Sequence, residues 1–266
     1  MTKKWMISLL CLAAILIAAP LWAQEKQEEV NTGQDPTKPL TRFDLRLKYQ
    51  DTMIKDREQF ITTPRFDKPI PLGGGWLLST RFDLPLVYND IPSRDNRDGD
   101  GEFGLGDFLT QFLFIKPVSP KLRVAGGAWF IWPTATQDQT GTGKWLVGPT
   151  VAAAYDISEL SKGSFVAGLL RQNFSYAGPD RRDDINETII QPVLNVNLPK
   201  FWFVTVAPEI KYNWKNKNQG WFVPLDLMVG KLLNRTTIVS IEGKYAIADK
   251  YPLYDWEIEA RIGLFF

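Results

Sequence analysis

The last residues of the chain alternate between apolar and charged side chains, and this period of two constrains the fold more than any other feature. The apolar positions are Trp256, Ile258, Ala260, Ile262, Leu264 and Phe266, and the charged positions between them are Glu257, Glu259 and Arg261. Because successive side chains of a β-strand point to opposite faces, the two sets lie on opposite sides of one strand. The pattern predicts a strand over residues 254–266 with one apolar and one polar face.

Comparable segments repeat along the chain and are separated by turn residues. Segment 201–214, for example, places Trp202 and Tyr212 on one face and Glu209 and Lys211 on the other. The predicted strands are 42–50, 57–71, 75–88, 103–116, 121–134, 144–156, 163–177, 185–198, 201–214, 220–232, 236–248 and 254–266, and 57–71 alternates least. The sequence therefore predicts an all-β fold, an antiparallel up-and-down β-barrel of about twelve strands.

Alternation alone does not identify the face that contacts lipid, because a soluble barrel also alternates, with its apolar side inward. Three features favour a transmembrane barrel over a soluble barrel or sandwich. The strands outnumber those of a small soluble barrel, charges lie in mid-strand opposite the apolar face, and the chain ends in an aromatic residue, Phe266. We expect residues 42–266 to form the membrane barrel, in contact with outer-membrane lipid, and Phe266 to be a signal for the barrel-assembly machinery.

The N-terminus has the order of charges and apolar residues that is typical of a secretory signal peptide. Lys3 and Lys4 precede an apolar run over residues 7–19, and Ala23 precedes a polar segment. The run is shorter than the ~20 residues of a membrane-spanning helix. We expect residues 1–23 to be a signal peptide, residues 24–41 a periplasmic lead-in of low order, and the mature chain to reside in the bacterial outer membrane. The single cysteine, Cys11, leaves with the peptide, so no disulfide is expected.

The lengths of the predicted connections give an orientation. Short gaps at 117–120, 199–200 and 233–235 follow even-numbered strands, whereas long gaps at 89–102, 135–143 and 178–184 follow odd-numbered strands. Outer-membrane barrels have short periplasmic turns and longer external loops. The lengths predict that both ends of the barrel domain lie on the periplasmic side and that the long loops face outside.

The predicted inward face carries charges of both signs. The candidate lumen-lining residues are Arg81, Asp83, Asp107, Gln111, Arg123, Arg171, Glu187, Gln191, Glu209, Lys211, Asp226, Glu242, Lys244, Glu257, Glu259 and Arg261. Rings of charged side chains select solutes in channels. Opposite charges also pair across strands and fill a narrow barrel. We give the two interpretations equal weight.

Other kinds of chemistry find little support in the sequence. Asp98, Asp100 and Glu102 alternate in a Gly-rich loop and are weak candidates for a cation site, but the full calcium-loop spacing is absent. Gly141-Thr142-Gly143-Lys144 lacks the spacing of a phosphate-binding loop. The chain has no histidine, which serine–histidine hydrolases require. We expect no metal, no cofactor and no enzymatic activity, and the near-neutral charge gives no reason to expect a nucleic-acid partner.

Several short motifs occur in a distinctive order. Gly104-Leu105-Gly106-Asp107 and Trp132-Pro133-Thr134-Ala135-Thr136 precede Gly141-Thr142-Gly143-Lys144-Trp145 and Val147-Gly148-Pro149, and then come Asn173-Phe174-Ser175-Tyr176-Ala177-Gly178, Asn186, Gln191-Pro192, Trp221 and Val223-Pro224-Leu225. Over residues 103–232 this order resembles the outer-membrane transporter family named after the meta-cleavage pathway of phenol degradation. The resemblance implies a porin-like role in the uptake of small aromatic or apolar molecules.

These observations favour an outer-membrane channel or transporter for small solutes, apolar or aromatic compounds among them. The alternative is a non-conducting barrel with a structural or surface-binding role. A membrane enzyme is a third hypothesis, and it lacks a recognisable catalytic pair.

Overall fold

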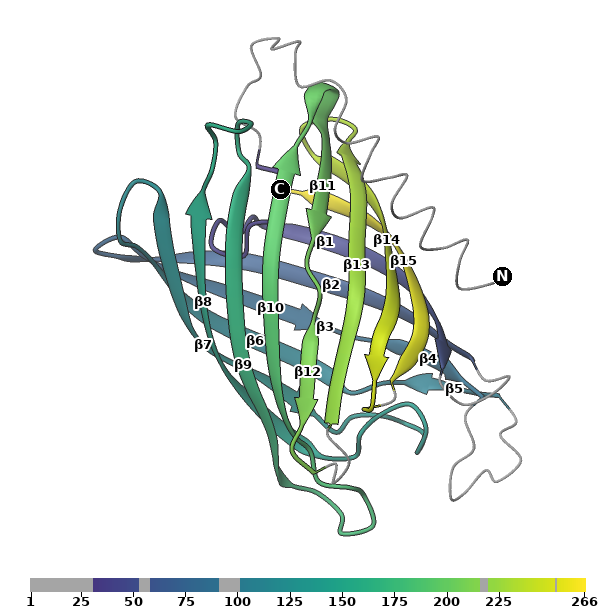
Figure 1. Cartoon of the computed structure of the whole chain (residues 1–266). Coiled ribbons are helices and arrows are strands. Elements are labelled where there is room, and N and C mark those ends of the chain that lie inside the picture. The colour runs from purple at the N-terminus through teal and green to yellow at the C-terminus, as the bar shows by residue number, and fades with distance from the viewer. Residues whose placement is uncertain (1–30, 53–57, 91–100, 216–219, 252) are drawn as a thin grey trace.

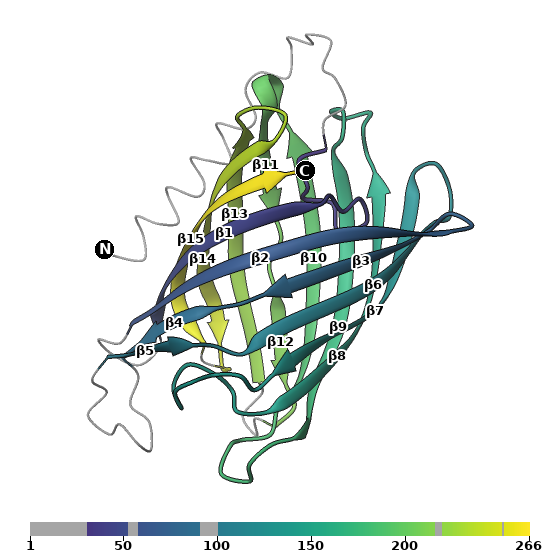
Figure 2. The same ribbon diagram turned by 180° about the vertical axis from the view of Figure 1, so that it is seen from behind.

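The strands form one closed antiparallel sheet. The structure is a computed structural model that describes residues 31–266 apart from 53–57, 91–100, 216–219 and 252. The first strand, β1 (Arg42–Thr52), pairs on one side with β2 (Glu58–Gly73) and on the other with the last strand, β15 (Tyr254–Phe265). The sheet is therefore a 12-strand barrel, as the alternation predicted (Figures 1 and 2).

The remaining elements follow in up-and-down order between these strands. They are β3 (Trp76–Asp83), β4 (Leu86–Asn89), β5 (Glu102–Leu105), β6 (Phe108–Pro117), β7 (Leu122–Trp132), β8 (Trp145–Asp156), β9 (Phe165–Ala177), β10 (Asn186–Asn197), the short helix η1 (Pro199–Phe201), β11 (Trp202–Val206), β12 (Ile210–Asn213), β13 (Gly220–Leu232) and β14 (Thr237–Asp249). Among the described residues, helical segments are too short or too polar to span a membrane.

Three predicted strands are each interrupted once. The break between β3 and β4 lies at Pro85, and the break between β11 and β12 lies at Pro208. Proline has no backbone N–H to donate to a neighbouring strand, so the ladder is interrupted there. Between β5 and β6, Asp107 instead turns toward the next loop and accepts hydrogen bonds from Thr142 N at 2.6 Å and Ala135 N at 3.2 Å.

Closure depends on the pairing of β1 with β15. The register runs from Arg42 opposite Phe265 to Asp51 opposite Trp256, and the N–H of Phe266 then donates to the carbonyl of Thr41 at 3.0 Å. A closed barrel satisfies its backbone N–H and C=O groups by pairing between strands, which lipid tails cannot do. The pairing leaves no strand edge between the first and last strands.

The outer face is apolar and the aromatic residues gather at its two ends. Exposed outward residues at one end are Phe43, Trp76, Tyr155, Trp202 and Phe266, those at the other are Tyr88, Phe103, Trp145, Tyr176, Trp214 and Trp221, and aliphatic residues between them are Leu47, Val151, Leu170, Leu225, Ile241 and Ile258. Two aromatic girdles around an aliphatic band are the pattern of transmembrane β-barrels.

The two ends of the barrel differ in their connections. One end carries the tight β2–β3, β6–β7 and β13–β14 turns, η1 and the C-terminus, and we call it the turn end. The other carries loops 135–143 and 178–184, which bind each other where Arg182 pairs with Asp138 at 2.7 Å, and we call it the loop end. Small apolar clusters on the inner wall lie near both ends, for example Phe203 with Ile238 at the turn end and Phe222 with Tyr254 at the loop end.

The assignment of the outward face to lipid can be tested by a substitution that changes the free energy of unfolding. Ile258 is half exposed in the middle of β15, where lipid is expected. Ile258→Arg should lower the free energy of unfolding by about 2–4 kcal/mol in lipid vesicles, because a cation near the bilayer midplane is costly. Ile258→Leu is the matched control and should unfold like the parent. Equal urea midpoints for all three proteins would contradict the assignment of this face to lipid.

Candidate functional site

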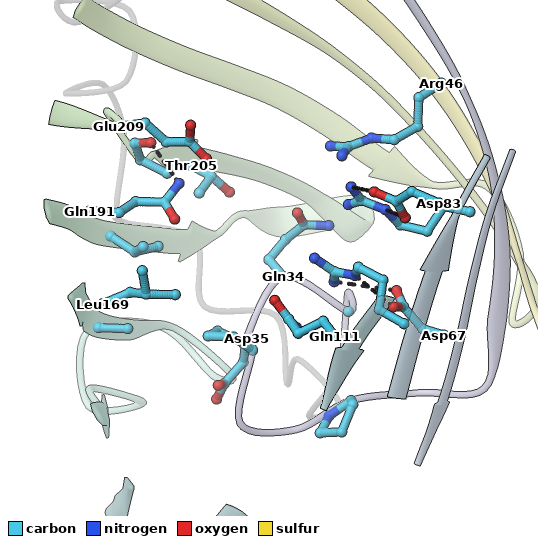
Figure 3. Close-up of a pocket in the computed structure, with 18 of the residues that line it drawn as sticks. Gln34, Asp35, Arg46, Asp67, Asp83, Gln111, Leu169, Gln191, Thr205 and Glu209 are labelled. Atoms are coloured by element: carbon cyan, nitrogen blue, oxygen red, sulfur yellow. Dashed lines mark hydrogen bonds and ion pairs between the residues drawn. The ribbon is translucent and has the colours of Figure 1, made fainter. Parts of the chain in front are cut away.

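A cavity of about 330 Å³ lies inside the barrel. Its lining comes from β1–β3, β6, β7, β9–β11, β13–β15 and the segment that precedes β1 (Figure 3). Small-molecule sites commonly have volumes of roughly 300–1,000 Å³. The lumen is therefore the candidate site, and the side chains of the surrounding strands determine its chemistry.

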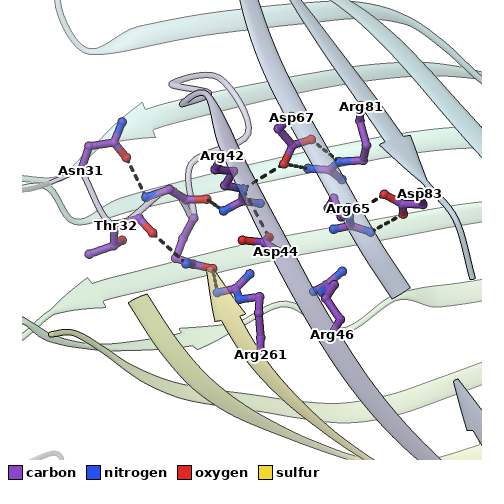
Figure 4. Close-up of polar contacts among 12 residues, drawn as sticks. Asn31, Thr32, Arg42, Asp44, Arg46, Arg65, Asp67, Arg81, Asp83 and Arg261 are labelled. Atoms are coloured by element: carbon purple, nitrogen blue, oxygen red, sulfur yellow. Dashed lines mark hydrogen bonds and ion pairs between the residues drawn. The ribbon is translucent and has the colours of Figure 1, made fainter. Parts of the chain in front are cut away.

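One wall of the lumen is a ladder of ion pairs on β1, β2 and β3. Asp67 accepts from Arg42 at 2.9 Å and from Arg81 at 2.7 Å, and Arg65 pairs with Asp83 at 2.6 Å (Figure 4). These charges point inward because they occupy alternate positions on their strands. Buried charges persist in a protein when they are paired and hydrogen-bonded, as they are here.

The ladder continues across the closing seam. Arg46 of β1 lies 2.7 Å from Glu259 of β15, and Lys244 of β14 lies 2.9 Å from Glu257. Lys48 reaches Glu257 from β1 at 3.6 Å. The charged wall thus spans β14, β15, β1, β2 and β3 and connects the first strand with the last through side chains as well as backbone.

The rest of the lining, from β6, which neighbours β3, round to β11, is mostly neutral. Its cavity-lining residues include Leu109 and Leu113 of β6, Leu169 of β9, Val193 of β10 and Ala207, which follows β11. The lumen therefore has a side dense in charges and a side of mixed aliphatic and polar residues, and Figure 3 shows Leu169 and Gln191 across the cavity from Asp67 and Asp83. A solute with both a polar group and an apolar body fits such an environment.

Arg171 and Glu209 are the charged residues of this second part of the lining, and Arg171 is the more buried of the two. Its Nε donates to Thr150 at 2.8 Å, its Nη2 donates to Gln111 at 3.1 Å, and its guanidinium lies 3.5 Å from the ring centre of Trp129. Gly148 makes room for this arrangement, since a Cβ there would lie 2.1 Å from the indole nitrogen of Trp129. The arginine is 5% exposed and is held by neutral groups.

The segment 31–41 enters the turn end of the barrel. Arg42 Nη1 donates to the carbonyl of Gly33 at 2.8 Å, Arg261 donates to Gln34 at 3.1 Å, and Lys38 reaches Asp156 on the far side at 3.2 Å. Figure 3 shows Gln34 and Asp35 between the two walls. We expected residues 24–41 to be a lead-in of low order, and these contacts of 31–41 were not foreseen; residues 24–30 lie outside the described residues.

The predicted inward residues divide into two groups. Those that line the cavity are Arg81, Asp83, Gln111, Arg171, Gln191, Glu209, Glu242, Lys244, Glu259 and Arg261. Those that do not are Asp107, Arg123, Glu187, Lys211, Asp226 and Glu257. Glu257 and Asp226 are nevertheless buried on the inner face, whereas Asp107 tethers the loop that contains Thr142.

Five charged residues of β1 and β2 line the cavity but were not among the predicted inward residues, namely Arg42, Arg46, Lys48, Arg65 and Asp67. In β1 the signal was present, because Arg42, Asp44, Arg46 and Lys48 occupy alternate positions. In β2 the alternation is obscured by prolines at positions 64, 69 and 71.

The other singled-out residues have less defined surroundings. The side chain of Phe266 is 79% exposed, and its role in assembly stays a prediction. Asp98 and Asp100 lie outside the described residues, and the described part of the chain, which includes Glu102, contains no cluster of metal ligands. In the loop 178–184, the hydrogen bond from Lys144 lowers the pKa of the Asp184 carboxyl and ties this loop to the start of β8.

The sequence matches no protein-family model and no curated protein. The fold does match solved structures. An outer-membrane channel of the COG4313 group from Pseudomonas putida F1 superposes with a TM-score of 0.67 at 12% identity, covering 90% of this chain and 100% of that one. The NanC porin gives 0.57 at 13% identity, covering 84% and 98%. The CymD monoaromatic hydrocarbon channel gives 0.52 at 8% identity, covering 85% and 92%.

These likenesses support the outer-membrane barrel fold, and they do not by themselves assign a function. Another matched barrel is the outer-membrane phospholipase A of Escherichia coli, with a TM-score of 0.50 at 9% identity, covering 85% of this chain and 92% of that one. Because one fold carries both channels and an enzyme, function must be argued from the lumen.

The charged wall makes a prediction about stability. Asp67→Asn would leave Arg42 and Arg81 without their shared carboxylate, and the free energy of unfolding should fall by about 3–5 kcal/mol, as expected when one partner of a buried ion pair is removed. The control is Lys121→Gln, which removes an exposed pair with Glu159 and should cost less than about 1 kcal/mol. Urea titration in detergent measures both, and equal losses would argue against a structural role for the ladder.

Proposed function

We propose that the chain is an outer-membrane channel for small solutes. The observation that carries the proposal is the cavity inside a closed barrel, lined on one side by a ladder of ion pairs and elsewhere by aliphatic and mostly neutral polar residues. The aromatic girdles and the apolar outer band place the barrel in a membrane on physical grounds. An apolar wall opposite polar groups suits small aromatic or apolar compounds that carry a polar substituent.

The test is solute-driven swelling of liposomes that contain the folded protein. Liposomes with the parent barrel should swell in phenol-sized solutes and small sugars faster than protein-free liposomes. Folding is checked by the heat-dependent gel shift of an intact barrel. Swelling at the protein-free rate, with folded protein in the bilayer, would favour the non-conducting alternative.

The lead-in segment is the feature that favours that alternative, because residues 31–41 cross the turn end of the lumen. Lys38 anchors the far side of the crossing through Asp156. We therefore expect Lys38→Ala combined with Gln34→Ala to increase the swelling rate by releasing the segment. Lys200→Ala, which removes an exposed charge at the same end, should swell like the parent. A double variant identical to the parent would mean that the segment does not restrict passage.

The localisation part of the proposal is export by the signal peptide, with the loop end outside. The only cysteine of the chain is Cys11, so single engineered cysteines report cleanly in the mature protein. Gln137→Cys and Asp180→Cys should react with a membrane-impermeant maleimide on intact cells, whereas Ser119→Cys and Asn234→Cys should react only after the outer membrane is opened. The reverse pattern would invert the orientation.

Enzymatic activity is not part of the proposal. The chain has no histidine, so a serine–histidine mechanism is excluded. Asp67, Asp83 and Glu257 each form an ion pair with an arginine or a lysine, which suits a structural or solute-binding role. Phe266, at the end of the apolar face of the last strand, is proposed as the contact for the barrel-assembly machinery.

A further inference from the structure

The basic side chains that line the cavity are not all paired with a carboxylate. Eight basic side chains line it, namely Arg42, Arg46, Lys48, Arg65, Arg81, Arg171, Lys244 and Arg261, whereas the acidic ones are the six residues Asp35, Asp67, Asp83, Glu209, Glu242 and Glu259. Six of the basic side chains lie within 4 Å of a carboxylate. Arg171 and Arg261 are the two for which the described part of the chain supplies no such contact.

Both of these arginines are buried. Arg171 is 5% exposed and Arg261 is 6% exposed. Arg261 contacts Gln34 Oε1 and the sulfur of Met228, and its Nε has no hydrogen-bond partner among the described residues. Burying a cation without an anion is costly, and an ionisable group retained inside a membrane protein commonly marks a solute pathway.

Arg171 has the more complete binding environment. Thr150 and Gln111 fix two of its nitrogens and the face of Trp129 supports the guanidinium, so Nη1 is left to meet a ligand. The nearby carboxylates, Glu209 and Glu187, make no ion pair with Arg171 within 4 Å among the described residues: Glu209 lies 3.6 Å from Lys211, and Glu187 accepts from Asn173 at 2.7 Å. A guanidinium held in a fixed plane is suited to a carboxylate.

The surroundings of Arg171 define the rest of the ligand. Leu109 and Leu113 line the cavity on the strand that carries Gln111, and Leu169 lies two residues from Arg171 on the same face of β9. These side chains offer contact to an apolar body but no hydrogen bond. A small neutral alcohol or hydrocarbon would leave the arginine without an anion, whereas an organic acid would satisfy both features.

We propose that the lumen holds a binding site for small monocarboxylates with an apolar or aromatic body, in which Arg171 binds the carboxylate and the leucines of β6 and β9 contact the body. This inference rests on the proposed channel function, for which it defines the class of solute. Arg261 is a second cation in the same cavity without an ion-pair partner among the described residues, and it already donates a hydrogen bond to Gln34 of the lead-in segment.

Fluorine NMR of the detergent-solubilised mature barrel tests the site without any membrane current. The probes are 4-fluorobenzoate and 4-fluorobenzyl alcohol, which share the ring and differ in charge. We expect the resonance of 4-fluorobenzoate to broaden on addition of protein, and benzoate to displace the probe. The alcohol should bind more weakly than the acid by a factor of about ten or more, because it loses a charge-assisted hydrogen bond.

Variants identify the residue. Arg171→Gln should weaken binding of 4-fluorobenzoate by about tenfold or more, while Arg171→Lys keeps the charge but loses the planar contact and should be intermediate. Arg123→Gln is the matched control, because Arg123 points inward but does not line the cavity, and it should bind like the parent. If Arg171→Gln does not fold, Arg171→Lys and the comparison of acid with alcohol in the parent still decide the matter.

The outcomes separate this inference from the proposed function. Equal binding of acid and alcohol, or full binding by Arg171→Gln, would overturn the carboxylate site and leave the channel proposal standing on its swelling assay. Absence of swelling together with specific binding of 4-fluorobenzoate would overturn the channel proposal. The carboxylate site would then stand as that of a barrel that binds the solute in its lumen without conducting it.

Discussion

Backbone pairing between β1 and β15 is the constraint on which the rest of the structure depends. A sheet in lipid must close, because an open edge would present unpaired N–H and C=O groups to hydrocarbon. When the sheet closes, one face of every strand points inward, so the side chains at alternate positions line a lumen. The same seam carries the ion pair of Arg46 with Glu259, so side chains as well as backbone groups connect the first strand with the last.

The lumen contains both buried ion pairs and aliphatic side chains, although apolar packing alone could fill a narrow barrel. Buried ion pairs stabilise little compared with apolar packing of the same volume, so a barrel that was only structural would lose nothing by replacing them. Here one wall keeps its charges and the other keeps leucines around Arg171. The division favours a role in handling solutes with both a charged and an apolar part.

Much of the barrel could be predicted from the sequence, because the period of two is local. Each predicted strand has its counterpart in the structure, including 57–71, where alternation was poorest. The interruptions at Pro85 and Pro208 were not predicted, although proline marks both. The contacts of residues 31–41 escaped prediction for another reason: Gly33, Gln34 and Lys38 have no periodicity, and their partners Arg261 and Asp156 lie far away in the chain. The lack of an ion-pair partner within 4 Å of Arg171 among the described residues depends on which strands face one another, and that information is absent from any single segment.

Single-channel recording in a planar bilayer tests the central claim, that solutes pass through the lumen, most directly. We predict that the parent protein inserts and gives discrete current steps in potassium chloride. A bilayer that stays silent while folded barrel is present, as judged by the heat-dependent gel shift of the recovered protein, would contradict it.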